Sequence, residues 1–142
     1  MKVIEQIRII PENIDVVWSI VSDLSRCDWV PGVSKIILDS DTRIFKMDGM
    51  GDLIERIIKC DESSKELHYS AIKTAIPINH HLAKIKLEVC EEETKFIWIT
   101  EIDPEHFAKP IEEGMLSSLD QLEVVIKKTK FSTNFKLTSS TT

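Results

Sequence analysis

Among the ionisable residues of this 142-residue sequence, Glu55, Tyr69 and His81 form a candidate set for acid/base chemistry. A carboxylate or an imidazole can transfer a proton, and a phenol can polarise a carbonyl. Such a set could promote an aldol-type cyclisation or a dehydration. In the simpler interpretation these groups pair with neighbours or water at the mouth of a pocket, because buried polar groups are usually hydrogen-bonded. Ligand contact without chemistry lies between the two interpretations.

The sequence lacks the usual patterns of metal and phosphate sites. His80 and His81 are adjacent, so on a strand they point to opposite faces and cannot bind one metal together. The other two histidines are distant in sequence, and no glycine-rich phosphate loop or nucleophile elbow occurs. We therefore expect no metal and no cofactor. Three widely spaced cysteines fit reduced thiols better than disulfides or zinc ligands: Cys27, Cys60 and Cys90.

The composition narrows the partners and the location. The formal net charge of -6 argues against a nucleic-acid surface, which needs clustered Lys and Arg. No apolar run is long enough to insert stably into a membrane. Glu5 and Arg8 interrupt the apolar N-terminus, so we expect no signal peptide and a cytoplasmic protein. The length fits one domain.

The spacing of apolar residues predicts the elements that position these side chains. Alternation predicts a strand over 2–10, and helical spacing predicts a helix over 11–24 followed by a short one over 25–29. Period two then predicts six strands, over 33–38, 43–47, 52–60, 67–72, 78–90 and 95–102. The last helix has an apolar stripe of Phe107, Ile111, Met115, Leu119, Leu122 and Ile126.

This order predicts an α+β fold. Successive strands with short turns form an antiparallel meander, and its apolar face needs a cover. The long C-terminal helix is the only element available, so a curved sheet of about seven strands should wrap around it as a helix-grip fold. We expect the domain to span 1–131 and the polar tail 132–142 to be disordered.

Strand parity predicts which side chains face the interior. Ile85 and Leu87 share an apolar face of their strand, opposite Lys84 and Lys86. The same parity carries three residues nearer the start of that strand inward, namely Asn79, His81 and Ala83. The preceding strand has Leu67, Tyr69 and Ala71 as its inner set. Both faces of the last strand are apolar, which leaves the direction of Trp98 open.

Five groups of short motifs, in this order, support a family resemblance: Ile10-Pro11-Glu12 with Val17-Trp18, Trp29-Val30-Pro31-Gly32-Val33, Glu55-Arg56-Ile57-Ile58 with Leu67-His68-Tyr69, Ile76-Pro77-Ile78, and Phe96-Ile97-Trp98. The sequence resembles the SRPBCC superfamily, which includes START lipid-transfer domains, birch-pollen-type allergens, plant abscisic-acid receptors and bacterial polyketide cyclases. The likeness covers about residues 2–128 and is greatest to small bacterial polyketide cyclase/dehydratase-like proteins. The abscisic-acid receptors imply an inward direction for Tyr69 and His81, and also for Glu55, Leu53 and Ile57.

The resemblance implies a cavity between sheet and helix, so we expect binding of a hydrophobic small molecule such as a lipid, polyketide or aromatic compound. The predicted contacts are Glu55, Ile57, Tyr69, Ala71, Asn79, His81, Ala83, Trp98, Met115, Leu119 and Leu122. A cyclase/dehydratase using Glu55, Tyr69 and His81 is the first alternative, and a protein-interaction module with a filled interior is the second. With two apolar faces, the last strand either meets a partner chain on its outer face, which suggests a homodimer, or is covered on both sides within the fold. Gly114 lies where a bulky side chain would crowd a ligand.

Overall fold

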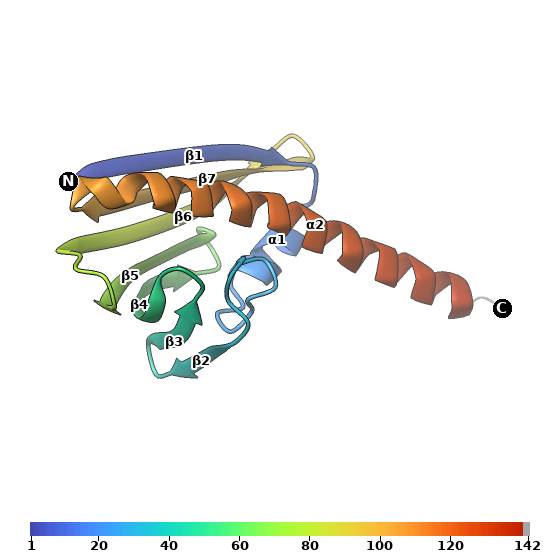
Figure 1. Ribbon diagram of the computed structural model, residues 1–142. Helices are drawn as coiled ribbons and strands as arrows, with labels where there is room; N and C mark the ends of the chain where they lie inside the picture. The colour runs from blue at the N-terminus through green and yellow to red at the C-terminus, as the bar shows by residue number, and fades with distance from the viewer. Residues whose placement is uncertain (141–142) are drawn as a thin grey trace.

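A curved sheet and one long helix dominate the fold (Figure 1). The computed structural model describes the backbone of residues 1–140 and the side chains of residues 1–130. The strands are β1 (Lys2–Ile10), β2 (Ile36–Asp39), β3 (Thr42–Met47), β4 (Gly51–Asp61), β5 (Glu66–Thr74), β6 (His80–Cys90) and β7 (Glu93–Asp103). The helices are α1 (Ile14–Val21), the 3-10 turn η1 (Glu105–Phe107) and α2 (Ala108–Ser140).

All strand pairs are antiparallel, and the order across the sheet is β1-β7-β6-β5-β4-β3-β2. The strands from β2 to β7 form a meander, which β1 closes at the far edge by pairing with β7. Figure 1 shows α2 running along β1 and β7, with its C-terminal part extending past the sheet. The predicted α+β helix-grip class is confirmed.

Irregular pairing between β4 and β5 helps to curve the sheet. The register shifts between Ile54 and Glu55, and again between Ile57 and Lys59. A bulge bends the strand that carries it and increases the local twist. These shifts curl the half of the sheet formed by β3, β4 and β5 away from a flat surface and toward the interior.

Helix α2 is held on the sheet by its apolar stripe and by polar contacts at the margin. The stripe buries Met115, Leu119, Leu122, Val125 and Ile126. Arg8 of β1 contacts Asp120 at 2.7 Å and Glu123 at 3.3 Å. Both carboxylates belong to α2, so the inward-facing arginine fixes the helix along the edge strand.

The first helix is shorter than predicted. The predicted start at residue 11 is too early, because Asn13 caps the helix with its side-chain oxygen, which accepts from the Asp15 backbone N–H at 2.8 Å. Such an N-cap residue keeps a non-helical backbone and therefore sets the first helical position. Pro11 lies in the bend between β1 and α1.

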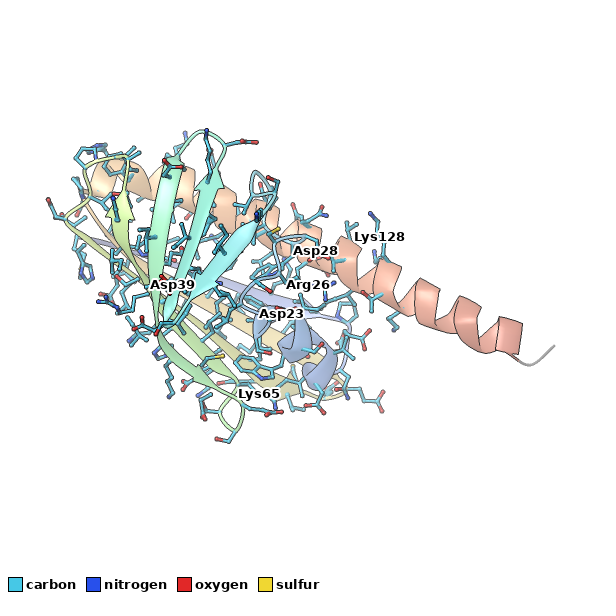
Figure 2. All side chains as sticks on the ribbon, turned by 90° about the horizontal axis from the view of Figure 1, so that it is seen from below. Asp23, Arg26, Asp28, Asp39, Lys65 and Lys128 are labelled. Carbon is cyan, nitrogen blue, oxygen red and sulfur yellow. The ribbon has the colours of Figure 1, made fainter. Side chains whose placement is uncertain are left out.

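The second short helix, predicted over 25–29, does not form. This segment consists of turns, held by a hydrogen bond from the Val30 N–H to the Cys27 carbonyl at 3.0 Å and by the Arg26–Asp28 ion pair at 2.7 Å. Five residues offer too few backbone hydrogen bonds to offset helix nucleation. Figure 2 shows Arg26 and Asp28 beside α2 and near Lys128. Gln121 of α2 donates to the Asp28 carbonyl at 3.2 Å, which anchors these turns to the helix.

The predicted disorder of the tail 132–142 stays a prediction, because the side chains of these residues and the backbone of the last two lie outside the described part of the chain. Among the described residues, no helix combines the length and the apolar character needed to cross a membrane.

Candidate functional site

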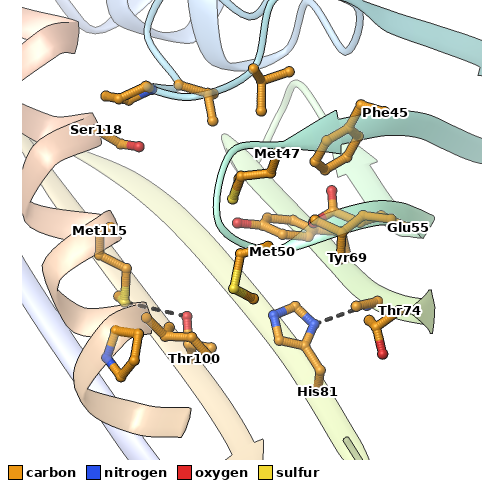
Figure 3. A pocket seen from close by; sticks show the side chains of 18 of the residues that line it. Phe45, Met47, Met50, Glu55, Tyr69, Thr74, His81, Thr100, Met115 and Ser118 are labelled. Carbon is orange, nitrogen blue, oxygen red and sulfur yellow. Dashed lines mark hydrogen bonds between the residues drawn. The ribbon is translucent and has the colours of Figure 1, made fainter. Parts of the chain in front are cut away.

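A pocket of about 490 Å³ lies between α2 and the inner face of strands β3 to β7. Members of the main core line it together with a smaller apolar cluster of Val33, Phe45 and Leu53. Most of its lining is apolar, while its polar residues come from several different strands (Figure 3). Apolar walls with a few polar groups are typical of a small-molecule site.

An ion pair forms part of the wall on β3 and β4. Arg43 and Glu55 are directly opposite in the register, and the guanidinium Nη2 donates to Glu55 Oε1 at 2.7 Å. Only 11% of the Arg43 side chain and 13% of the Glu55 side chain are exposed. Burial raises the pKa of Glu55, and the positive charge of Arg43 opposes that rise.

Tyr69 extends this polar wall on β5. The Arg43 guanidinium lies 4.8 Å from the centre of the Tyr69 ring, which is cation–π geometry. Burial and the nearby Glu55 carboxylate raise the pKa of Tyr69 strongly, while the Trp98 N–H acts in the opposite direction. The Trp98 N–H is buried and has no hydrogen bond of normal geometry, so it lies near the phenol without a good bond to it.

His81 sits where β5 and β6 separate. Their ladder ends at the Tyr69–Ala83 pair. Beyond this pair, the Ala71 backbone N–H donates to His81 Nδ1 at 2.9 Å and not to a backbone carbonyl of β6. Desolvation lowers the pKa of His81 to about 4. The imidazole is therefore neutral near pH 7, and the occupied Nδ1 leaves it no free lone pair with which to act as a base.

The mouth of the pocket is marked by those lining residues that are also exposed. Pro31, Asp48 and Gly49 form one side, and Pro110, Gly114 and Ser117 of α2 form the other. A side chain added at Gly114 would meet nothing within 4 Å, and the same holds at Gly49. The two glycines therefore leave the entrance open.

The pocket brings together six of the predicted contact residues: Glu55, Tyr69, Ala71, His81, Trp98 and Met115. Four others are absent from its lining: Leu119 and Leu122 belong to the main core, Ile57 packs against it, and Ala83 is buried. Ala83, Leu119 and Leu122 are each exposed by no more than 1%. Their inward direction was predicted correctly, but neighbouring core residues cover them.

Asn79 lies outside the pocket, contrary to prediction. It is exposed, and its side-chain amide donates to Asp103 Oδ2 at 3.1 Å. Strand β6 begins only at His80, so strand parity does not extend back to Asn79. The backbone N–H of Asn79 donates to the Asp103 carbonyl, which also ties this residue to the end of β7.

The parity analysis missed Arg43. Its strand alternates, with the buried Arg43 and Phe45 on the inner face and Ile44 and Lys46 more accessible on the other. The sequence did contain a signal for its inward direction, because Arg43 lies two residues before Phe45 on the same strand and so shares its face. Its partner could not be identified in this way, because the Arg43–Glu55 pairing depends on the register between β3 and β4.

The direction of Trp98 is inward. Its side chain is 7% exposed, and its ring packs against Trp29 at 5.9 Å and Phe96 at 5.8 Å between centroids. The opposite face of β7 and β1 carries half-buried and exposed apolar side chains: Ile97, Ile99, Val3, Ile7 and Ile9. The apolar outer face predicted for the last strand thus continues onto the edge strand.

Solved structures share this architecture. XoxI from Bacillus cereus is 18% identical with a TM-score of 0.82, and the match covers 92% of this chain and 99% of XoxI. A START superfamily protein from Mycobacterium smegmatis is 12% identical with a TM-score of 0.75, and the match covers 89% of this chain and 98% of that protein. The Zhui aromatase/cyclase from a Streptomyces strain is 12% identical with a TM-score of 0.74, and the match covers 89% of this chain and 94% of the cyclase. At these identities the likeness shows the fold.

Fold and pocket together define a protein with a START-like helix-grip fold. The chain belongs to the family described as polyketide cyclase / dehydrase and lipid transport, whose model matches residues 1–123. The resemblance inferred from the sequence motifs is therefore confirmed. No curated protein matches the sequence. Among the residues with described side chains, no group of three or more His, Cys, Asp or Glu could hold a metal ion.

Breaking the ion pair should destabilise the protein. Replacing Arg43 with Met leaves the Glu55 carboxylate desolvated and unpaired, and we expect the free energy of unfolding in urea to fall by about 2 kcal/mol. This is less than for a fully enclosed pair, because both side chains border an open pocket. Arg56→Met is the control, since the Arg56–Asp41 pair is 53% and 58% exposed and should contribute less than about 1 kcal/mol. Equal losses in the two variants would contradict this role.

The stability of the protein should fall as the pH is lowered through the range in which His81 takes up a proton. The unfolded chain takes up a proton on this residue near pH 6.5, whereas the folded chain does so only near pH 4. The free energy of unfolding should therefore decrease as the pH falls from about 6.5 to 4. Glu55, with its raised pKa, contributes with the opposite sign.

His81→Asn isolates the His81 contribution. Its amide oxygen can still accept from the Ala71 N–H, but the residue does not titrate. Urea unfolding at a series of pH values should give a shallower slope for this variant than for the wild type. Identical slopes would show that the imidazole is not desolvated in solution.

Proposed function

We propose that the protein binds a hydrophobic small molecule, such as a lipid, a polyketide or an aromatic compound, in the pocket beneath α2. The observation that carries this proposal is the pocket of about 490 Å³, with apolar walls and polar groups confined to a few positions. The protein-interaction alternative required a filled interior, and the pocket argues against it. The description of the family, which includes lipid transport, supports the same class of ligand.

Simple energetics agree with this function. A ligand that buries on the order of 300 Å² of apolar surface gains roughly 7 kcal/mol from transfer out of water. Lost translational and rotational freedom removes at least about 4 kcal/mol of that gain. The apolar walls alone therefore support weak binding, and the polar residues decide between ligands of equal apolar area.

A cyclase/dehydratase is the second candidate. The observation that favours it is the buried Glu55 carboxyl group with its raised pKa, close to Tyr69 in a mostly apolar pocket. A carboxyl group in such surroundings is a candidate general acid or base. Binding and catalysis can share the pocket, so the two functions are separated by measuring turnover.

We also infer a homodimer formed through the outer face of β1 and β7. Val3, Ile7 and Ile9 are 53%, 50% and 43% exposed, and the half-buried Ile97 and Ile99 lie beside them. Light scattering coupled to size exclusion checks this inference, and a strict monomer at high concentration removes it. The absence of a nucleic-acid partner and the cytoplasmic location stay predictions from the sequence.

A bulky residue at the mouth should hinder binding. We expect Gly114→Phe to weaken binding of the neutral fluorescent probe N-phenyl-1-naphthylamine at least tenfold, because its ring extends into the entrance. Gly114→Ala is the matched control. It adds one methyl group in open space, should keep the wild-type affinity and should stabilise the helix by up to about 1 kcal/mol. Probe fluorescence and urea unfolding measure the two effects, and unchanged probe affinity in Gly114→Phe would place the entrance elsewhere.

The enzyme hypothesis has a direct test. 4-Hydroxy-4-phenylbutan-2-one is a small β-hydroxy ketone that loses water to give a conjugated enone, whose absorbance reports turnover. If the protein is a dehydratase for such substrates, the wild type should accelerate this reaction, and Glu55→Gln should reduce the rate at least about a hundredfold. Retained binding of N-phenyl-1-naphthylamine by Glu55→Gln would separate lost catalysis from lost folding. No acceleration by the wild type would count against dehydration of this substrate class.

A further inference from the structure

The hydrogen bonding of His81 fixes which ring nitrogen carries its proton. Nδ1 accepts from the Ala71 backbone N–H at 2.9 Å, so the proton of the neutral ring must be on Nε2. Figure 3 shows the ring in the pocket, with this second nitrogen turned away from the dashed bond. No hydrogen bond to Nε2 occurs among the residues whose side chains are described. His81 therefore presents one N–H donor to the pocket.

Tyr69 presents a second donor. Its hydroxyl makes no hydrogen bond of normal geometry within the described part of the chain, and it is not among the atoms buried from solvent. The Trp98 N–H lies near the phenol oxygen and cannot accept a hydrogen bond. The hydroxyl hydrogen is therefore available to a molecule in the pocket.

The two donors are neighbours on adjacent strands. The Tyr69 and His81 rings are 6.1 Å apart between centroids and inclined at 46°. The same wall offers fewer open acceptors than donors, because Glu55 Oε1 already accepts from Arg43 and only the second oxygen of this carboxyl group is left. The positive guanidinium beside Tyr69 also disfavours a cationic group at this position. The wall thus matches an acceptor atom better than a donor or a cation.

We propose that Tyr69 and His81 together bind a hydrogen-bond acceptor oxygen of the carbonyl kind, carried by an otherwise apolar ligand. This inference rests on the proposed function and narrows it, because it selects ketones, aldehydes and esters over hydrocarbons and amines of the same shape. It also assigns His81 a role in positioning, as a donor, and not as a base. An apolar ligand would leave both donors unpaired on displacing their water, which is unfavourable.

An isosteric pair of probes tests the inference. 2-Acetylnaphthalene and 2-isopropenylnaphthalene differ in one position, where a C=O replaces a C=CH₂ group. Calorimetric titration of the intact protein with each probe gives two dissociation constants, and their ratio reports the contribution of the acceptor oxygen. With two neutral hydrogen bonds, the wild type should prefer the ketone by about tenfold.

Variants assign the preference to its residues. Tyr69→Phe removes only the hydroxyl, and His81→Asn removes the Nε2 donor but can still accept from the Ala71 N–H. Each should reduce the ratio to about threefold, and the double variant should reduce it to about one, while binding of the alkene persists. Ser118→Ala is the control, because Ser118 also lines the pocket and should leave the ratio unchanged. A preference that disappears in Ser118→Ala but survives in the double variant overturns the proposal.

The outcomes separate this inference from the proposed function. If the wild type binds neither probe nor N-phenyl-1-naphthylamine, the proposed function fails. If it binds both naphthalenes equally, only the acceptor preference fails. A readout without ligand is the ¹⁵N spectrum of the His81 side chain at pH 7, which should show protonated Nε2 and unprotonated Nδ1. The opposite tautomer would overturn the proposal even if a variant failed to fold.

Discussion

The structure depends on one geometric constraint: one long helix, aided only by the short α1 against β6 and β7, must cover a sheet of seven strands. A helix with its side chains is about 10 Å across, whereas seven strands at about 4.8 Å spacing span roughly 30 Å. Helix α2 therefore lies along β1 and β7, where Arg8 and the apolar stripe hold it. The other half of the sheet, which α2 does not cover, must curve so that its inner face turns toward the interior. The pocket is the space that remains between the two halves.

The Arg43–Glu55 ion pair is an unusual feature in the wall of a mostly apolar pocket. A well-packed apolar pair in such a position is often as stable as an ion pair or more so, because desolvation opposes the attraction between the charges. Stability alone therefore does not account for the pair, whereas a role in orienting ligands or in acid/base chemistry would. The cation–π contact with Tyr69 joins this pair to the residues that face the pocket.

The separation of β5 and β6 connects the curvature of the sheet to the chemistry of His81. In a continued ladder, Ala71 would pair with the backbone of residue 81, but its N–H reaches the imidazole. Ser70 donates its hydroxyl hydrogen to the His81 carbonyl and so satisfies the backbone group that the ladder has lost. The interruption of the ladder thus fixes the orientation of the His81 side chain. The same bond that closes the gap in the sheet also determines the tautomer of the ring.

The sequence alone determined the order of the strands and of the two α-helices, the antiparallel meander and the inward parity of Tyr69, His81 and Ala83, because alternation and helical spacing are local properties of the chain. It did not determine where a strand begins, so the parity argument failed at Asn79. The partner of Arg43 and the hydrogen bond to His81 depend on register and on the splay between strands. Only the tertiary structure decides these, because they arise from the way the curved sheet closes around a helix too narrow to fill it.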